Sequence, residues 1–175
     1  MRLFEEFEDE HRLVDAVAGS LIRFSDSGEE VAVSAEDVAE FVRLFSVFVA
    51  GFHHEREEQT LFRALVERAE IPADRGPLPA IEADHREAAK LVSELEENAG
   101  DLRAAAVTAR RLAHHLWEHV DKENSVLFPE SMDRLRRNGV TLLEGRAPTR
   151  DEEAARELGE RLVERFPPID DPEIV

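Results

Sequence analysis

The same short pattern of side chains occurs twice in this chain, at the spacing of a helix. A histidine is followed four residues later by a glutamate and then by the pair Leu-Phe. The two copies are His53, Glu57 and Leu61-Phe62, and His119, Glu123 and Leu127-Phe128. Residues four apart lie one turn apart on the same helical face, so each copy predicts an imidazole and a carboxylate side by side. The pattern therefore requires two helices that each carry polar groups on one face.

A lone histidine precedes each copy in a similar setting, because Glu10-His11-Arg12 parallels Asp84-His85-Arg86. Each half of the chain thus supplies one single histidine and then one histidine–glutamate pair. The repeat predicts two helical hairpins of the same design, related by a pseudo-two-fold axis.

Apolar residues recur every three or four positions through four long segments, and the repeated histidines and glutamates lie on these stripes. This period is typical of amphipathic helices that pack around a common core. Prolines, glycines and polar runs separate the segments. The pattern predicts helices at about 3–24, 35–69, 79–98 and 102–126, with Pro129 kinking or ending the last and a short continuation to Arg137.

Capping signals mark several helix starts, namely Ser34 with Asp37, Asp101, and Thr149 with Glu152. The last predicts a short fifth helix at about 150–165. No segment has the period of a strand, so we expect an all-α fold, an up-down-up-down four-helix bundle with an appended C-terminal helix. The bundle is expected over 1–135. Residues 136–175 are expected to form a loop, the short helix and an extended acidic tail, and 25–34 to form a loop.

Two such hairpins, packed antiparallel, bring four imidazoles and two carboxylates together in the core. These are His11, His53, His85 and His119, with Glu57 and Glu123. Two imidazoles for each metal and two bridging carboxylates, with a bridging oxo or hydroxo group, are the ligands of a binuclear site that keeps an open position. Imidazole and carboxylate without thiolate favour iron, and manganese as the second choice.

A single histidine on an apolar stripe is more often a satisfied core residue than a metal ligand. Six polar side chains on four stripes are a different case, because each group left without a partner costs about 1–3 kcal/mol. The recurrence at equal spacing therefore favours a metal site.

Neighbouring residues provide further candidate ligands. His54 and Glu58 also stand four apart, but alignment of the two Leu-Phe pairs favours His53 and Glu57. His115 lies one turn before His119, as a fifth nitrogen ligand or a hydrogen-bond donor to the ligands. Glu82 lies three residues before His85 but has less support from the repeat.

Composition excludes several classes of function. The chain of 175 residues has no cysteine, which excludes thiolate metal sites, iron–sulfur clusters and disulfides. Its net charge of −18 argues against nucleic acid and anionic membranes as partners. The acidic N-terminus lacks the apolar core of a signal peptide, so we expect a cytoplasmic protein.

The order of these motifs resembles the hemerythrin-like (HHE cation-binding) domain family. The resemblance covers about residues 3–130 and rests on His11, the run from His53 to Phe62, His85, and the run from His119 to Pro129. It implies a four-helix bundle with a di-iron centre that reacts with O₂, hydrogen peroxide or nitric oxide. It also implies that the four histidines are nitrogen ligands and that Glu57 and Glu123 are bridges.

The chain departs from the oxygen-carrying hemerythrins in two places. Those proteins have two histidines a turn apart in the third helix, whereas Ile81 and Ala89 flank His85 here. Their fourth-helix carboxylate is an aspartate five residues after its histidine, whereas Glu123 follows His119 by four. A centre with four imidazoles has two similar metals and favours reactive chemistry over reversible carriage. A fifth ligand at His115 would reverse that inference.

These observations predict a non-haem di-iron protein that binds, and reacts with, a small oxidant. As an enzyme it would be an oxidoreductase that decomposes peroxide or reduces O₂ or NO. Any electron donor would be external, because the chain has no dinucleotide-binding glycine pattern. The alternative is a di-iron sensor that signals oxidant or iron status to a partner without turnover.

Overall fold

The computed structural model describes residues 1–27 and 32–169, and every regular element in these ranges is helical. This confirms the all-α prediction for the described residues. In chain order the elements are α1 (Arg2–Asp26), α2 (Ala35–Leu44), η1 (Phe45–His54), η2 (Glu57–Phe62), α3 (Arg63–Ala69), α4 (Pro77–Glu97), α5 (Leu102–Lys122), η3 (Glu123–Leu127), α6 (Phe128–Arg137) and α7 (Arg150–Arg165). The three elements labelled η are π-helical.

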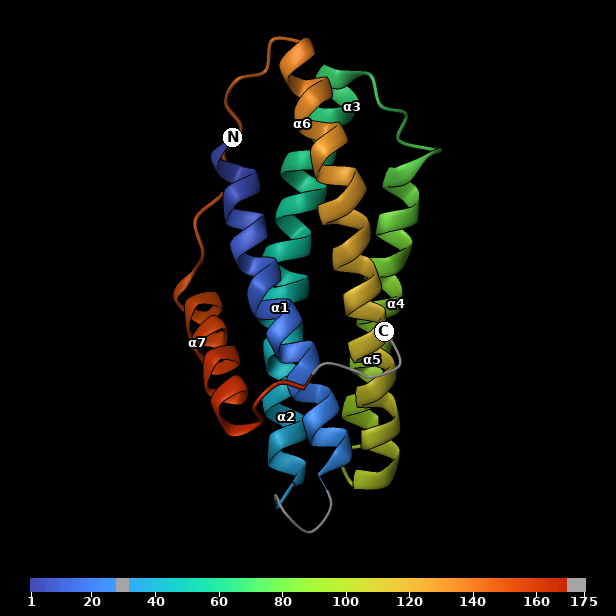
Figure 1. The fold of residues 1–175 in the computed structure, drawn as a ribbon, viewed down its shortest axis with the longest axis vertical. Coiled ribbons are helices and arrows are strands. Elements are labelled where there is room, and N and C mark those ends of the chain that lie inside the picture. The colour runs from blue at the N-terminus through green and yellow to red at the C-terminus, as the bar shows by residue number, and fades with distance from the viewer. Residues whose placement is uncertain (28–31, 170–175) are drawn as a thin grey trace.

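Four long helical rods extend along the long axis of the molecule (Figure 1). The first rod is α1, the second runs continuously from α2 to α3, the third is α4, and the fourth runs from α5 to α6. The chain reverses direction between each rod and the next (Figure 1). α1 and α4 each pack along α5, and α2 packs against α4.

The predicted caps are present at the starts of three helices. Ser34 and Asp37 form a reciprocal capping box at α2, and Thr149 and Glu152 form another at α7. The Asp101 side chain accepts hydrogen bonds from two backbone N–H groups at the start of α5. Each cap satisfies N–H groups that have no partner within the helix, which explains why the helices begin there.

π-helical turns interrupt the second and fourth rods at the repeated motifs, which the sequence pattern did not predict. η1 ends at His54, η2 begins at Glu57, and η3 begins at Glu123. π turns are uncommon and occur frequently at functional sites. Pro129 lies in the first turn of α6, directly after the π turn of η3, and the helix continues to Arg137 as predicted.

The buried apolar side chains form two clusters, separated along the rods by a polar layer. In α1, Phe7 belongs to the smaller cluster and Val14 to the larger, and His11 lies between them in sequence. In α4, Ile81 and Ala88 bracket His85 in sequence, although Ala88 itself is buried outside both clusters. The polar residues of the repeat therefore occupy one level of the molecule, enclosed by apolar packing on both sides.

α7 packs beside α1, α2 and η1 (Figure 1). Its Leu158 and Leu162 side chains, and Phe166 at its C-cap, belong to the larger apolar cluster, so α7 contributes to the core. Beyond it, the Ile169 backbone N–H donates to the Gly19 carbonyl oxygen at 3.4 Å. The rest of the predicted tail, and residues 28–31 of the predicted loop, lie outside the described residues. Among the described residues, no helix is both long and apolar enough to cross a membrane.

Candidate metal centre

Seven buried polar side chains converge at the level between the two apolar clusters. All are at most 6% exposed, and Glu57 and Glu123 are fully buried. They come from all four rods: His11 from α1, His53 and His54 from η1, Glu57 from η2, His85 from α4, His119 from α5 and Glu123 from η3. Five imidazoles and two carboxylates thus surround one point in the core.

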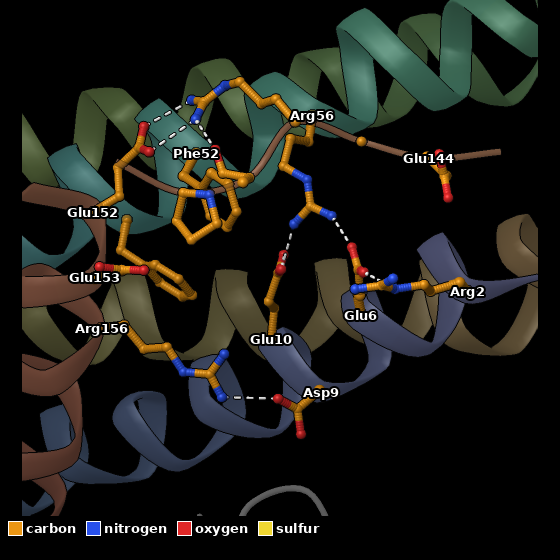
Figure 2. Close-up of a pocket in the computed structure, with 15 residues that line it drawn as sticks. Arg2, Glu6, Asp9, Glu10, Phe52, Arg56, Glu144, Glu152, Glu153 and Arg156 are labelled. Carbon is orange, nitrogen blue, oxygen red and sulfur yellow. Dashed lines mark hydrogen bonds and ion pairs between the residues drawn. The ribbon is translucent and has the colours of Figure 1, made fainter. Parts of the chain in front are cut away.

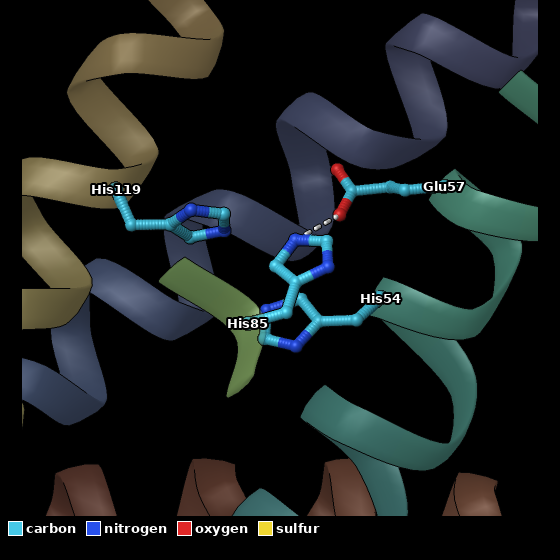
Figure 3. A group of neighbouring side chains, drawn as sticks. All are labelled: His54, Glu57, His85 and His119. Atoms are coloured by element: carbon cyan, nitrogen blue, oxygen red, sulfur yellow. Dashed lines mark ion pairs between the residues drawn. The ribbon is translucent and has the colours of Figure 1, made fainter. Parts of the chain in front are cut away.

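The seven side chains form two groups, within each of which the candidate ligand atoms lie within 4.8 Å of one another. One group contains His11, His53, Glu57 and Glu123. The other contains His54, Glu57, His85 and His119, shown in Figure 3. Because Glu57 belongs to both groups, its carboxylate lies between the two sets of imidazoles.

The separations between these atoms match neighbouring ligands of a metal ion. His11 Nε2 lies 3.1 Å from His53 Nε2 and 3.1 Å from a Glu123 oxygen. His85 Nε2 lies 3.4 Å from a Glu57 oxygen, and His119 Nε2 lies 3.3 Å from a Glu123 oxygen. An octahedral ion with bonds of about 2.1 Å places adjacent ligand atoms about 3 Å apart. These separations are compatible with coordination of a metal ion by the cluster.

Several atoms of the cluster are buried without a hydrogen-bond partner. They are both carboxylate oxygens of Glu57 and of Glu123, Nε2 of His85, and both ring nitrogens of His119. A buried polar atom left unpaired costs about 1–3 kcal/mol, and more when it carries charge. So many unpaired atoms directed at one place are explained if they serve as ligands, and the residues present therefore fit a metal site.

Hydrogen bonds from outside the cluster hold three of the imidazoles. Glu10 accepts from His53 Nδ1 at 2.8 Å, and Glu58 accepts from His85 Nδ1 at 2.7 Å. Asn124 Oδ1 lies 2.8 Å from His11 Nδ1. A bond at one ring nitrogen fixes the tautomer and directs the other nitrogen at the metal position.

These orienting residues follow the internal repeat. Glu58 and Asn124 each come directly after a central glutamate, and each binds the lone histidine of the opposite half. Glu10 and Asp84 each precede a lone histidine. Glu10 binds His53, and an Asp84 oxygen lies 4.0 Å from His119 Nδ1. The repeat thus carries the orienting shell as well as the ligands. In the sequence, these orienting residues are marked by acidic or amide side chains directly adjacent to the motif histidines and glutamates.

The repeated Leu-Phe pairs also have a role in the site. The Phe128 ring stacks on His11 with centroids 5.3 Å apart, and the Phe62 ring lies nearly parallel to His85 at 6.2 Å. Phe7 contacts the His53 ring edge-on at 5.6 Å. These rings cover the imidazoles on the side of the smaller apolar cluster and exclude water from them.

Arg56 is a buried cation beside the cluster that the sequence reasoning did not identify. Its guanidinium binds Glu10 at 2.5 Å and also pairs with Glu6, while Phe52 lies against it with the centroid 4.5 Å away (Figure 2). Arg56 thereby holds the carboxylate that orients His53. It also lines a charged cavity of about 430 Å³ between α1, η1, α7 and the 144–148 loop (Figure 2).

Burial and neighbouring charges raise the pKa values of some histidines in the cluster and lower those of others. Burial acts to lower the pKa of His11, but the Glu123 carboxylate, 3.1 Å away, and the charge of Glu57 raise it to about 9. The pKa of His85 is also about 9, because Glu57 and Glu58 outweigh burial. Burial lowers the pKa of His119 to about 4, and depresses those of His53 and His54.

The two central carboxylates have pKa values that shift in opposite directions. Burial and the charge of Glu123 raise the pKa of Glu57 to about 7. Burial acts to raise the pKa of Glu123, but the nearby imidazoles of His11, His119 and His85 lower it overall. Two carboxylates this close need positive charge between them, which protons or metal ions supply.

All six principal candidates from the sequence lie in the cluster. Of the less certain candidates, one lies in the cluster and three lie outside it. His54 lies inside it, although the repeat had favoured His53 alone. His115 Nε2 instead lies 2.8 Å from the Asp84 carbonyl oxygen, outside both groups of candidate ligands. Glu58 orients His85, and Glu82 pairs with Arg86 at 3.9 Å at the surface. The fifth imidazole is therefore His54, because the wide turn of η1 brings both adjacent histidines inward.

The family model described as the hemerythrin HHE cation-binding domain matches residues 2–131 of the chain. Searches of curated proteins and of solved structures gave no significant match. The matched segment contains all four rods but for the last turns of α6, and all seven residues of the cluster. Since the match covers most of the chain and the buried histidines and glutamates fit a cation site, the chain belongs to the hemerythrin HHE cation-binding domain family.

Proposed function

We propose that the four rods act as an up-down-up-down four-helix bundle that holds two iron ions and binds a small oxidant, O₂, hydrogen peroxide or nitric oxide. The observation that carries the proposal is the set of unpaired, buried oxygens of Glu57 and Glu123 in the midst of five imidazoles. Imidazole and carboxylate without thiolate favour iron over softer metals, with manganese second.

The two groups of residues assign the ligands. His11 and His53 would hold one ion and His54, His85 and His119 the other, with Glu57 and Glu123 between them. When bound, iron supplies the redox chemistry and the coordination positions that a small oxidant requires.

The chain itself positions the ligands and excludes water. Glu10, Glu58 and Asn124 orient three imidazoles, and Phe62 and Phe128 cover two of them. A ligand fixed in this way loses little entropy on binding, and a dry surrounding strengthens its interaction with a cation. These features support tight binding of the metal.

Reversible carriage is disfavoured for a centre with four imidazoles and two similar metals. With His54 the cluster has five, divided two and three between the groups. Five imidazoles are therefore compatible with binding of the oxidant without turnover as well as with oxidoreductase activity. Oxidoreductase activity would need an external electron donor.

Metal analysis with anomalous scattering tests the proposal. Protein purified anaerobically from iron-replete cells is expected to hold about two irons per chain, each within bonding distance of one group of ligands. The His119→Ala variant should lose iron, whereas His114→Ala, which changes a histidine outside the cluster, should keep it. A wild-type protein without a transition metal at this position would refute the proposal.

A second candidate function is sensing, and the contacts of Arg56 favour it. His53 binds Glu10, Glu10 binds Arg56, and the Gly145 backbone lies so close to Arg56 that an added Cβ would stand 2.6 Å from Nε. A change at the metal centre therefore has a direct physical connection to the C-terminal segment.

Hydrogen exchange of the oxidised and reduced protein tests this second function. A sensor should show a redox-dependent change of exchange in residues 144–156, and the same change should be absent in Arg56→Met. Equal exchange in both redox states would exclude this route of signalling.

A further inference from the structure

A second cavity, of about 200 Å³, lies between η1, α4 and α5 and has His54 of the cluster in its lining. Its inner wall is formed by apolar side chains and by the imidazole of His54. Val49, Val92, Leu112 and Leu116 are buried there. The cavity therefore extends from the surface of the molecule to a residue of the candidate metal centre.

Small side chains leave the outer end of this cavity open. Ser46 and Ala50 lie one turn apart on η1, and Ala89 and Ser93 lie one turn apart on α4. All four are exposed. Larger residues at these positions would close the gap between the two rods, so the opening depends on this choice of side chains.

His54 differs from three of the four other imidazoles in how it is held. His11, His53 and His85 each have a hydrogen-bond partner outside the cluster. Among the described residues, His54 has no side-chain hydrogen bond. It is 5% exposed and is held by stacking on His85, with centroids 3.9 Å apart and rings 9° from parallel. An unpartnered imidazole thus forms the polar end of an otherwise apolar cavity.

The two cavities beside the cluster have opposite chemistry. The cavity at Arg56 is lined by arginines and carboxylates, whereas the one at His54 offers few hydrogen-bonding groups. A hydroxyl group transferred into apolar surroundings without a partner loses about 2–7 kcal/mol, and hydrogen peroxide has two. Anions are further disfavoured by the net charge of −18 and by Glu96 at the opening. O₂ and NO are uncharged, apolar and small enough to fit.

We propose that the cavity above His54 is the access and holding site for an uncharged apolar diatomic gas, O₂ or NO. The inference rests on the proposed function and narrows its substrate class. It assigns Ala50 and Ala89 as residues that determine which molecules reach the centre.

Xenon binding tests the site independently of any metal. Apolar cavities of this size accept xenon, which has no chemistry of its own. A crystal of the protein under xenon pressure should show xenon between Val49, Leu112 and His54. The Ala50→Leu/Ala89→Leu variant should lose it, and the matched control Ala80→Leu/Ala154→Leu, at exposed positions outside the cavity, should keep it. Absence of xenon from the wild-type cavity would overturn the proposal, even in a protein that holds two irons.

Rapid-mixing kinetics of the reduced, iron-loaded protein test the substrate class. In Ala50→Leu/Ala89→Leu the second-order rate constants for O₂ and for NO should fall by roughly tenfold, since a barrier of about 1.4 kcal/mol has that effect. The reaction with hydrogen peroxide should keep its rate, as should all three reactions in the control. A fall for only one gas would identify that gas as the molecule that uses the site. An equal fall for peroxide, or no fall for either gas, would refute the proposal.

Iron content, measured on every variant, separates this inference from the proposed function. A chain without iron that still binds xenon at His54 would refute the metal centre and retain the apolar site. A chain that holds iron, binds no xenon and shows the same gas kinetics in wild type and in Ala50→Leu/Ala89→Leu would support the metal centre and refute the apolar site.

Discussion

At the scale of single residues, the centre depends on which nitrogen atoms reach it. His54 directly follows the motif histidine His53, and His115 lies one turn before the motif histidine His119. Only His54 belongs to the cluster. His115 bonds to the Asp84 carbonyl oxygen instead. The difference decides whether one group of candidate ligands has two imidazoles or three.

Replacement of His54 should change the amount of bound metal. We expect His54→Ala to reduce iron from about two ions per chain toward one, since one group would lose one of its three imidazoles. His115→Ala should retain both. Elemental analysis of the two purified variants checks the prediction, and the opposite result would restore His115 as the fifth ligand.

Glu10 should affect the metal through His53 without touching it. In Glu10→Gln the charge that supports the His53 Nδ1–H is lost, and such orienting partners are worth about 10–100-fold in metal affinity. Competition with a coloured chelator measures the change. Glu8→Gln, at an exposed position of the same helix, is the control and should leave the affinity unaltered.

At the scale of the elements, the π turns and the capping of α7 position the site and its surroundings. η1 directs two adjacent histidines inward, which an α-helix with its strict 100° step does not do as readily. The start of α7 is held by Glu152, which closes the capping box with Thr149 and binds Arg146 at 2.7 Å. This contact fixes the 144–148 loop against Arg56.

The Glu152 contacts should make stability depend on pH. The hydrogen bonds from Arg146 hold the pKa of Glu152 at about 2, below its ordinary value of 4.5. A lowered pKa in the folded state stabilises the fold above pH 4.5, and that stabilisation is lost as the pH falls toward 2. Glu152→Gln should cost about 1–2 kcal/mol at neutral pH.

Denaturant unfolding at a series of pH values tests the prediction. The difference between wild type and Glu152→Gln should shrink between pH 4.5 and 2. The neighbouring Glu153→Gln should have a far smaller effect at every pH. A constant difference between wild type and Glu152→Gln would mean that the contact contributes through packing and not through charge.

At the scale of the whole molecule, the proposed metal and the fold should stabilise each other. The cluster joins all four rods at a level where the apolar core is interrupted. Glu57 and Glu123 are fully buried and repel one another when both are ionised. A cation bound between them removes that repulsion in the folded state alone.

Removal of the metal should therefore lower the melting temperature. At free iron 100 times its Kd the bound metal contributes about 2.7 kcal/mol, which a strong chelator withdraws. Thermal unfolding followed by circular dichroism, with and without chelator, measures the difference. In Glu57→Gln/Glu123→Gln the chelator should have little effect, and an unchanged melting temperature in the wild type would contradict the prediction.

The sequence by itself determined the helical class, the positions of the rods, the caps at Ser34, Asp101 and Thr149, and the candidate ligands His11, His53, Glu57, His85, His119 and Glu123. The physical reason is that these depend on local properties. Helical period fixes which residues share a face, capping depends on residues three apart, and the repeat showed which faces belong together.

Only the tertiary structure decided what depends on packing between rods. His54 lies in the cluster together with His53 because η1 is π-helical, whereas adjacent residues lie about 100° apart on an ordinary α-helix. The sequence pattern assumed an α-helical period and could not show this local change of geometry. The bonds from Glu10 to His53 and Glu58 to His85 join different rods. The cavity above His54 likewise exists only where η1, α4 and α5 meet.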